Sequence, residues 1–277
     1  MSTSSPPKQL AEQSYIRDQL MAGGKSAARR YADLVVGEGA SFTQLLKYEL
    51  ITCLLGGLPG AGGLALRQLF YPRLFKQVGR GVVFGRHVVI RNARNITLGD
   101  QVMIDDLCVL DGRGAGAEGV VLGDRVIVNR GTTIQAKIGP IHIGADSDIG
   151  ASSLVHAQGG VAIGRAVVIG GGCKISGGAF QIARSAAAGA GDIADMAARE
   201  QTRWTAGPVR IGDKCLLGMG TMVLDGVELG EGVVAGAGTV ITRSVPAYAV
   251  VAGVPGKVLR MRDDAAAGSP EPRDRES

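Results

Sequence analysis

The stretch VAIGRAVVIGGGCKI, residues 161–175, places an isoleucine at every sixth position, namely Ile163, Ile169 and Ile175. Five other segments repeat this period, with an aliphatic residue or once an alanine at each sixth position. They are Leu98, Ile104 and Leu110; Leu122, Val128 and Ile134; Ile143, Ile149 and Val155; Ile211, Leu217 and Val223; and Leu229, Ala235 and Ile241. A helix repeats every 3.6 residues and a half-buried strand every two, so a period of six indicates a short strand, a bend, and another strand.

Three such hexads make one coil of a three-walled column, and stacked coils bury the aliphatic residues as an internal ladder. Phe84 and Ile90 indicate an earlier, less regular coil, which brings the count to about seven. At roughly 4.8 Å per stacked strand the column is about 34 Å long. The sequence therefore predicts a mainly β protein, a parallel β-helix over residues 81–262.

Composition agrees with a narrow core, because the 277 residues include 44 glycines and only 4% aromatic residues. The net charge of +5 is modest and its lysines and arginines are scattered, which argues against a nucleic-acid partner. The four cysteines lack metal-type spacing, and residues 1–13 lack the pattern of a secretory signal. We expect a cytoplasmic protein without a metal site, in which Cys108, Cys173 and Cys215 are buried thiols.

Residues 1–80 lack the period of six and form an N-terminal helical region. Helices are expected at about Gln9–Met21, Lys25–Val36, Phe42–Leu55 and Gly63–Phe75. One interpretation is a cap on the open end of the column, which repeat proteins need for solubility. The other is a peripheral membrane contact through residues 42–75, flanked by Lys47, Arg67 and Arg73.

An insert at 177–208 interrupts the ladder between Ile175 and Ile211. Asp192 is a candidate N-cap for a helix that runs to about Trp204. A long excursion from a regular solenoid is usually functional or disordered, and we expect this one to form a wall of a substrate pocket. Residues 263–277 are polar and charged, and are expected to be a disordered tail.

The run VELGEGVVAGAGTVITRSVPAYAVVAGVPGKVLRMR at 227–262 resembles the end of hexapeptide-repeat acyltransferases of the maltose and galactoside O-acetyltransferase type. The runs at 54–75 and 79–92 are similar to a branch associated with surface-polysaccharide synthesis, so the resemblance covers residues of about 45–262. It implies a left-handed β-helix and a homotrimer, with acetyl-CoA or another acyl-CoA in the groove between two prisms. It also implies transfer of an acyl group to a hydroxyl of a sugar or glycan precursor.

Such a transfer needs a base for the hydroxyl proton, and histidine suits this because its pKa lies near working pH. In the resembling enzymes this histidine follows the last ladder residue before the insert by five positions, where this chain has Phe180. Among His87, His142 and His156, His156 is the best-placed replacement, because it follows the last ladder residue of the preceding coil. A surface or interface role for His156 remains open, and His87 is expected to be structural.

The resemblance also implies binding residues. For the CoA these are Gly218, Gly236, Ala237, Thr239 and Lys257, although the coil geometry alone also favours glycine at these corners. For the acceptor they are Ser152, Glu200, Gln201 and Trp204.

Two other functions are open to the same fold. The first is an inactive homologue that acts as a scaffold or binding protein, since Phe180 cannot abstract a proton. The second is a zinc enzyme of the γ-carbonic-anhydrase type, which requires three converging imidazoles. It is disfavoured because His142 and His156 occupy different places in the coil and His87 is several coils away.

Overall fold

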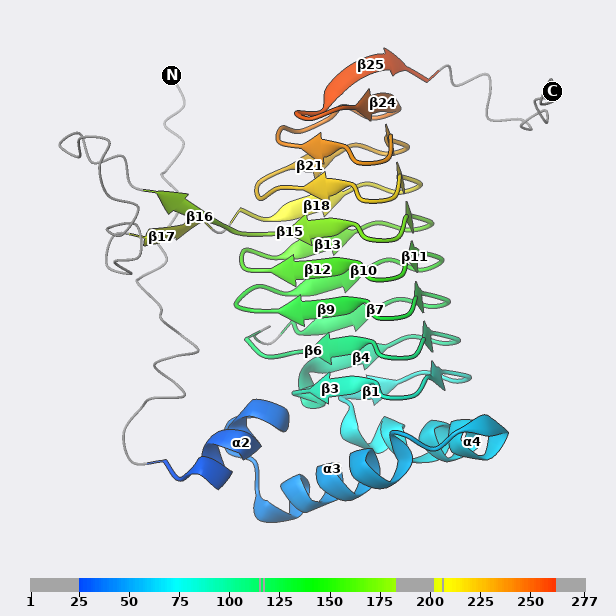
Figure 1. The fold of residues 1–277 in the computed structure, drawn as a ribbon, viewed down its shortest axis with the longest axis vertical. Coiled ribbons are helices and arrows are strands. Elements are labelled where there is room, and N and C mark those ends of the chain that lie inside the picture. The colour runs from blue at the N-terminus through cyan, green and yellow to red at the C-terminus, as the bar shows by residue number, and fades with distance from the viewer. Residues whose placement is uncertain (1–24, 115, 117, 183–201, 206, 263–277) are drawn as a thin grey trace.

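The computed structural model describes residues 25–114, 116, 118–182, 202–205 and 207–262, and it forms a column of stacked coils above a layer of helices (Figure 1). Each coil contributes one strand to each of three sheets, here called faces A, B and C, whose strands are parallel except for the last strand of face B. Face A contains β1 (Gln77–Val78), β4 (Ile96–Leu98), β7 (Val120–Leu122), β10 (Ile141–Ile143), β13 (Val161–Ile163), β18 (Val209–Ile211) and β21 (Glu228–Leu229). Face B contains β2 (Val83–Phe84), β5 (Met103–Ile104), β8 (Ile127–Val128), β11 (Asp148–Ile149), β14 (Val168–Ile169), β19 (Leu216–Leu217), β22 (Val234–Ala235), β24 (Ala249–Ala252) and β25 (Lys257–Met261). Face C contains β3 (Val89–Arg91), β6 (Val109–Asp111), β9 (Thr133–Ala136), β12 (Leu154–Ala157), β15 (Lys174–Ser176), β20 (Met222–Val223) and β23 (Val240–Ile241).

The described residues thus make seven coils, and the parallel β-helix predicted from the period of six is confirmed. Every predicted ladder residue is at most 3% exposed. The ladder also pairs in register, as where Ile149 lies between Val128 and Ile169 on face B. The first coil begins at Gln77, four residues before the boundary expected from the sequence, and Phe84 and Ile90 are its ladder residues.

The corners between faces are tight. A Cβ added to Gly144 would lie 2.5 Å from the carbonyl oxygen of Gly164 in the next coil, so these corners exclude a side chain. Cys108, Cys173 and Cys215 are buried beside other corners, as predicted, and burial raises the pKa of Cys108 to about 11. These thiols are therefore packing groups rather than nucleophiles.

The helical region contains α2 (Ala27–Val35), α3 (Phe42–Leu55), α4 (Gly60–Phe70) and the 3₁₀ turn η1 (Tyr71–Leu74), in agreement with three of the four predicted helices. The expected helix at 9–21 and the expected tail at 263–277 lie outside the described residues. Helix α3 begins where predicted because the Ser41 hydroxyl accepts from the Gln44 backbone while the Gln44 side chain accepts from the Ser41 backbone. No helix in the described part of the chain is long and apolar enough to cross a bilayer.

These helices close the first coil, as the cap interpretation predicts. The rings of Tyr71 and Phe75 pack on Phe84, with centroids 5.3 and 5.5 Å away. The placement of Arg67 beside a membrane was wrong, because Arg67 is only 3% exposed. Its guanidinium donates to the carbonyl oxygens of Phe84, Leu55 and Leu58, which joins the ends of both helices to the column.

The insert leaves the column without disturbing the stacking, because β13 pairs directly with β18 and β15 with β20. A short antiparallel hairpin, β16 (Ala179–Ile182) with β17 (Thr202–Thr205), projects from the side of the column (Figure 1). The helix expected to run to Trp204 was therefore wrong at its end, where 202–205 is a strand. Its remainder lies outside the described residues.

The ladder is expected to dominate stability. Ile104→Ala removes a fully buried side chain and should lower the free energy of unfolding by about 2–5 kcal/mol. Met103→Ala on the same strand removes a side chain that is 40% exposed, and should cost less than about 1 kcal/mol. Urea unfolding followed by circular dichroism measures both, and equal losses would contradict the ladder.

Candidate site at the corner between faces C and A

One corner of the column carries a row of polar side chains, at the point where each face C strand ends and the chain turns toward face A. The residue just after the third ladder residue is polar in the first five coils: Arg91, Asp111, Gln135, His156 and Ser176. Each is paired in register with the next. We call this row the corner column.

Asp111 anchors the corner column. Its side chain is fully buried and is held by Arg113, whose Nε donates to both carboxylate oxygens at 2.8 and 2.9 Å. The Nε2 of Gln135 donates to Asp111 Oδ2 at 3.3 Å. A buried carboxylate needs such partners, because an unpaired charge is costly to desolvate. Asp111 therefore fixes Gln135 directly below His156.

His156 lies one coil above Gln135 and is half-buried. Its backbone carbonyl accepts from Gly177 at 2.8 Å, so its backbone is tied to the coil from which the insert departs. Burial lowers the pKa of His156 below its usual value of 6.5, and the positive charge of Lys137 lowers it further. The imidazole is therefore neutral at pH 7, the form that accepts a proton.

The insert leaves from the same corner one coil above His156. Ser176 ends β15 and donates to the carbonyl oxygen of Gly178 at 2.6 Å, after which the hairpin begins. Phe180, which occupies the expected catalytic position, lies in β16 and pairs with Trp204 in β17. The position that holds histidine in the resembling enzymes is thus part of the hairpin and not of the corner column.

The predicted acceptor residues are not all brought to this corner. Ser152 lies at the other end of β12, between faces B and C. Four residues of extended chain place it about 13 Å from His156. Trp204 lies on the hairpin strand opposite Phe180. Glu200 and Gln201 lie outside the described residues.

The predicted CoA residues do come together, at the corner between faces B and C in the last two coils. Gly218 packs on Ala237, and a Cβ on Gly218 would lie 2.5 Å from the Ala237 nitrogen. The buried Thr239 donates to the carbonyl oxygen of Gly236 at 2.6 Å. Lys257 is exposed at the start of β25, beside the turn that packs on Thr239. Stacking explains the glycines, whereas it does not require the exposed Lys257.

The other two histidines lie elsewhere. His142 is exposed on the outer side of face A. His87 has a left-handed backbone with a φ of 55°, and its N–H donates to the carbonyl oxygen of Gly56 at 2.8 Å, which links α3 to the first coil. Within the ranges that the structure describes, no three His, Cys, Asp or Glu side chains are grouped as metal ligands.

Sequence reasoning missed Asp111, Arg113, Gln135 and Lys137. A signal for Asp111 and Gln135 was available, because both follow the third ladder residue of their coil just as His156 does. Arg113 and Lys137 lie in corner loops of irregular length, so no period marks them.

Comparison with known proteins identifies the repeat in part of the column. Residues 140–176 and 208–243 match the family described as the hexapeptide repeat of succinyl-transferase, so these two segments of the β-helix are hexapeptide repeats. The chain is 47% identical over 60 residues to the 2,3,4,5-tetrahydropyridine-2,6-dicarboxylate N-acetyltransferase of Enterococcus faecalis. It is 43% identical over 60 residues to the Staphylococcus aureus (strain JH9) protein of the same name. These segments are 22% of this chain and 26% and 25% of those proteins, so the chain spans about a quarter of the length of these curated relatives.

A solved structure extends the likeness in fold. A mutant of AntD, an N-acyltransferase from Bacillus cereus in complex with dTDP and coenzyme A, superposes with a TM-score of 0.50 at 20% sequence identity. The match covers 72% of this chain and 90% of that one.

The charge of Lys137 should be detectable at His156. We expect one of the three imidazoles to titrate below pH 6.5 by NMR and to be the resonance lost in His156→Ala. Lys137→Gln should raise this pKa, because it removes a positive charge that opposes protonation. Lys214→Gln is the matched control, because Lys214 forms an exposed ion pair with Glu231, and it should leave the pKa of His156 unchanged. A pKa of His156 at or above 6.5 would contradict the geometry described for this corner.

Proposed function

We propose that this protein is an acyltransferase that moves an acyl group, in the first instance acetyl, from acyl-CoA to a hydroxyl of a sugar or glycan precursor. The observation that carries the proposal is His156, a half-buried neutral base at the corner where the insert leaves the column. The relatives named as acetyltransferases and the fold of AntD support acyl transfer from a CoA thioester. The hydroxyl acceptor follows from the resemblance of 227–262 to sugar O-acetyltransferases.

The chemistry assigned to His156 is proton transfer. The acceptor oxygen attacks the thioester carbonyl carbon while the imidazole takes the hydroxyl proton. As the tetrahedral intermediate collapses, the C–S bond breaks, and the proton held by His156 passes to the departing sulfur. A backbone N–H of the corner loops is the natural donor to the oxyanion, because such groups are fixed before the reaction begins.

The thioester carrier is proposed to bind at the corner between faces B and C, with Lys257 near its phosphates. Coils six and seven lie two to three coils above His156, about 10–14 Å along the column. An extended arm that reaches down a groove from Lys257 would bring its thioester to the level of His156, across face C from the corner column of the same copy.

A homotrimer supplies such grooves. Faces B and C carry exposed apolar residues on their outer sides, including Met103, Val168 and Leu216 on face B and Val89 on face C. The outer side of face A instead carries His142, Arg210 and Glu228, all exposed. Apolar strand faces of this extent favour contact with further copies of the chain.

A scaffold without turnover is the second candidate, and Phe180 favours it. The acyltransferase and the scaffold are distinguished by incubating the purified protein with acetyl-CoA and a panel of sugars and measuring the release of free CoA. His156→Ala should lower the rate by a factor of about 10²–10⁴, the usual contribution of a general base. His142→Ala, the matched control on face A, should leave the rate within about twofold.

Light scattering must show that both variants keep the assembly of the natural protein. Failure of the natural protein to release CoA, together with turnover by Phe180→His, would establish the scaffold instead. The rate of an active enzyme should also fall as the pH drops through the pKa of His156, because the imidazolium cannot accept a proton.

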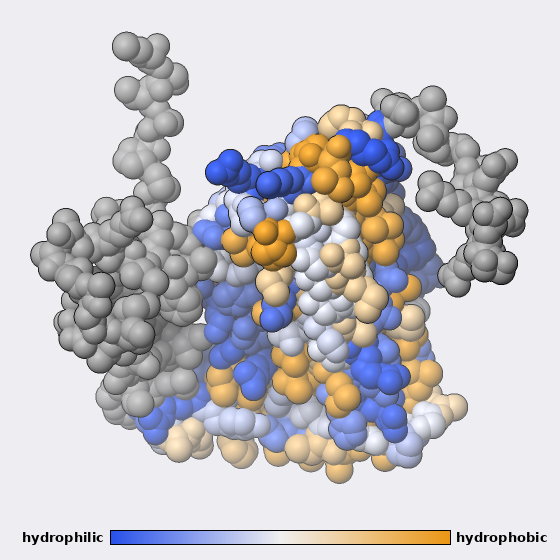
Figure 2. Space-filling model, turned by 45° about the horizontal axis from the view of Figure 1, so that its top comes forward, coloured by the Kyte–Doolittle hydropathy of each residue, from blue (hydrophilic) through white to orange (hydrophobic). Residues whose placement is uncertain are grey.

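We further propose a cytoplasmic protein that contacts the inner face of a membrane through its helical region. On α3, Phe42, Leu46, Leu50 and Leu54 recur every four residues and are 47–76% exposed. Leu69 of α4 is 58% exposed, and Figure 2 shows apolar surface along the lower edge, where these helices lie. With Arg67 buried, the charged residues left at the surface of 42–75 are the exposed Lys47 and Arg73 and the half-buried Glu49. This combination suits the surface of a bilayer with anionic lipids.

Flotation with vesicles rich in anionic lipid tests the membrane contact. Leu46→Glu with Leu50→Glu should abolish flotation, because two charges would enter the apolar face. Leu259→Glu, at a residue that is 66% exposed on β25, is the control and should float as the natural protein does. A natural protein that stays with the soluble fraction would contradict the membrane contact. A loss of oligomers in the double variant would show that the helices instead bind another copy.

A further inference from the structure

A pocket of about 510 Å³ opens on the same corner as His156, below it, between α2 and the first three coils. Its walls come from α2, the turn after α2, Asn92 and Asn95 at the end of coil one, the loop after β6 in coil two, and Lys137 after β9 in coil three. This volume is in the range of small-molecule sites and exceeds the space of a single small ion. None of the functional residues predicted from the sequence lies in it.

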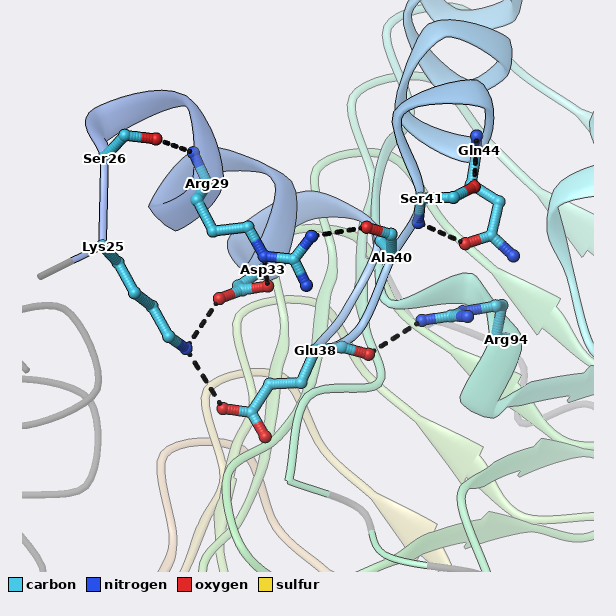
Figure 3. Close-up of polar contacts among 9 residues, drawn as sticks. All are labelled: Lys25, Ser26, Arg29, Asp33, Glu38, Ala40, Ser41, Gln44 and Arg94. Carbon is cyan, nitrogen blue, oxygen red and sulfur yellow. Dashed lines mark hydrogen bonds and ion pairs between the residues drawn. The ribbon is translucent and has the colours of Figure 1, made fainter.

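The pocket is strongly basic. Five cationic side chains line it against two carboxylates; the cations are Lys25, Arg30, Arg94, Arg113 and Lys137, and the carboxylates are Asp33 and Glu38. Both carboxylates belong to the helical side, where Lys25 meets Asp33 at 2.8 Å and Glu38 at 3.8 Å (Figure 3). The negative charge of these two carboxylates is thus already paired with Lys25.

On the column side of the pocket Arg113 is paired with the buried Asp111, whereas Arg94 and Lys137 keep unneutralised positive charge. Arg94 donates to the backbone carbonyl oxygen of Glu38 at 3.4 Å, and among the described residues it meets no carboxylate (Figure 3). The Lys137 ammonium has neither a hydrogen bond nor an ion pair within the described ranges. Burial and the charges of Arg113 and Arg91 lower the pKa of Lys137. Arg94 is exposed and Lys137 is half-buried, and two cations that line one pocket favour the binding of an anion there.

Lys137 is also held in place. Its N–H donates to the carbonyl oxygen of Ala157 at 2.8 Å, in the coil of His156. The coil-two loop packs so closely on it that a Cβ on Gly114 would collide with the Lys137 carbonyl oxygen. A ligand bound by Lys137 would therefore lie one coil below His156, about 5 Å along the column.

We propose that this pocket binds the phosphate groups of the acceptor, so that the acceptor is a sugar that carries a diphosphate. This inference rests on the proposed function. The diphosphate would contact Arg94 of coil one and Lys137 of coil three, and the sugar would extend up the corner column toward His156. The same chemistry is offered by a nucleoside diphosphate sugar and by an isoprenoid diphosphate sugar.

Calorimetric titration with inorganic pyrophosphate tests the pocket independently of turnover. We expect binding by the natural protein, at least tenfold weaker binding by Lys137→Gln and by Arg94→Gln, and binding within about twofold for Lys214→Gln. His156→Ala should bind like the natural protein, so loss of catalysis and loss of the pocket remain distinct. Unchanged melting temperatures establish that the variants are folded.

Displacement experiments identify the source of the phosphate. If UDP displaces pyrophosphate, the acceptor is a nucleoside diphosphate sugar. If farnesyl diphosphate displaces pyrophosphate and UDP does not, the acceptor is a sugar linked to an isoprenoid diphosphate. With a phosphorylated acceptor, Lys137→Gln should raise the KM for that acceptor at least tenfold and leave the KM for acetyl-CoA unchanged. Displacement of pyrophosphate by CoA, equal binding by Lys137→Gln, or no binding by the natural protein would overturn the proposal.

Discussion

The structure depends on the in-register stacking of its coils. Each short strand bonds to the strands of the coils above and below, as Ile149 does with Val128 and Ile169, so a residue at a given place in one coil stands over its counterpart in the next. An isolated coil could not bury its aliphatic residues, because they are covered by the aliphatic residues of the neighbouring coils. The same register that builds the buried ladder also lines up the outward residues into rows.

The candidate functional residues lie in those outward rows, and the rows at the two ends of the face C strands carry different residues. One end carries the corner column, where Arg113 and Gln135 hold the buried Asp111, and Gln135 pairs in register with His156. The other end carries small residues whose form is set by stacking, with Lys257 beside them. The helical cap contributes to the first end, because α2 closes a basic pocket against the lower coils. Cap and column therefore act together in the proposed recognition of the acceptor.

The sequence predicted what is periodic or locally encoded and missed what is assembled from distant segments. The ladder could be found because each coil repeats it, and α3 could be placed because Ser41 and Gln44 form a local capping box. Arg67 was misplaced because its partners are three backbone carbonyls from separate segments, which no side-chain pattern reveals. Trp204 was assigned to a helix although it pairs across a hairpin with Phe180, 24 positions earlier. The basic pocket was missed for the same reason, since α2 and three coils supply its walls.

The most direct test of this account is an experimental structure of the protein with a stable acetyl-CoA analogue. The account predicts that the acetyl carbonyl lies at the corner between faces C and A, beside the imidazole of a His156 from the same or a neighbouring copy. An acetyl group bound at a corner that no His156 can reach would contradict it.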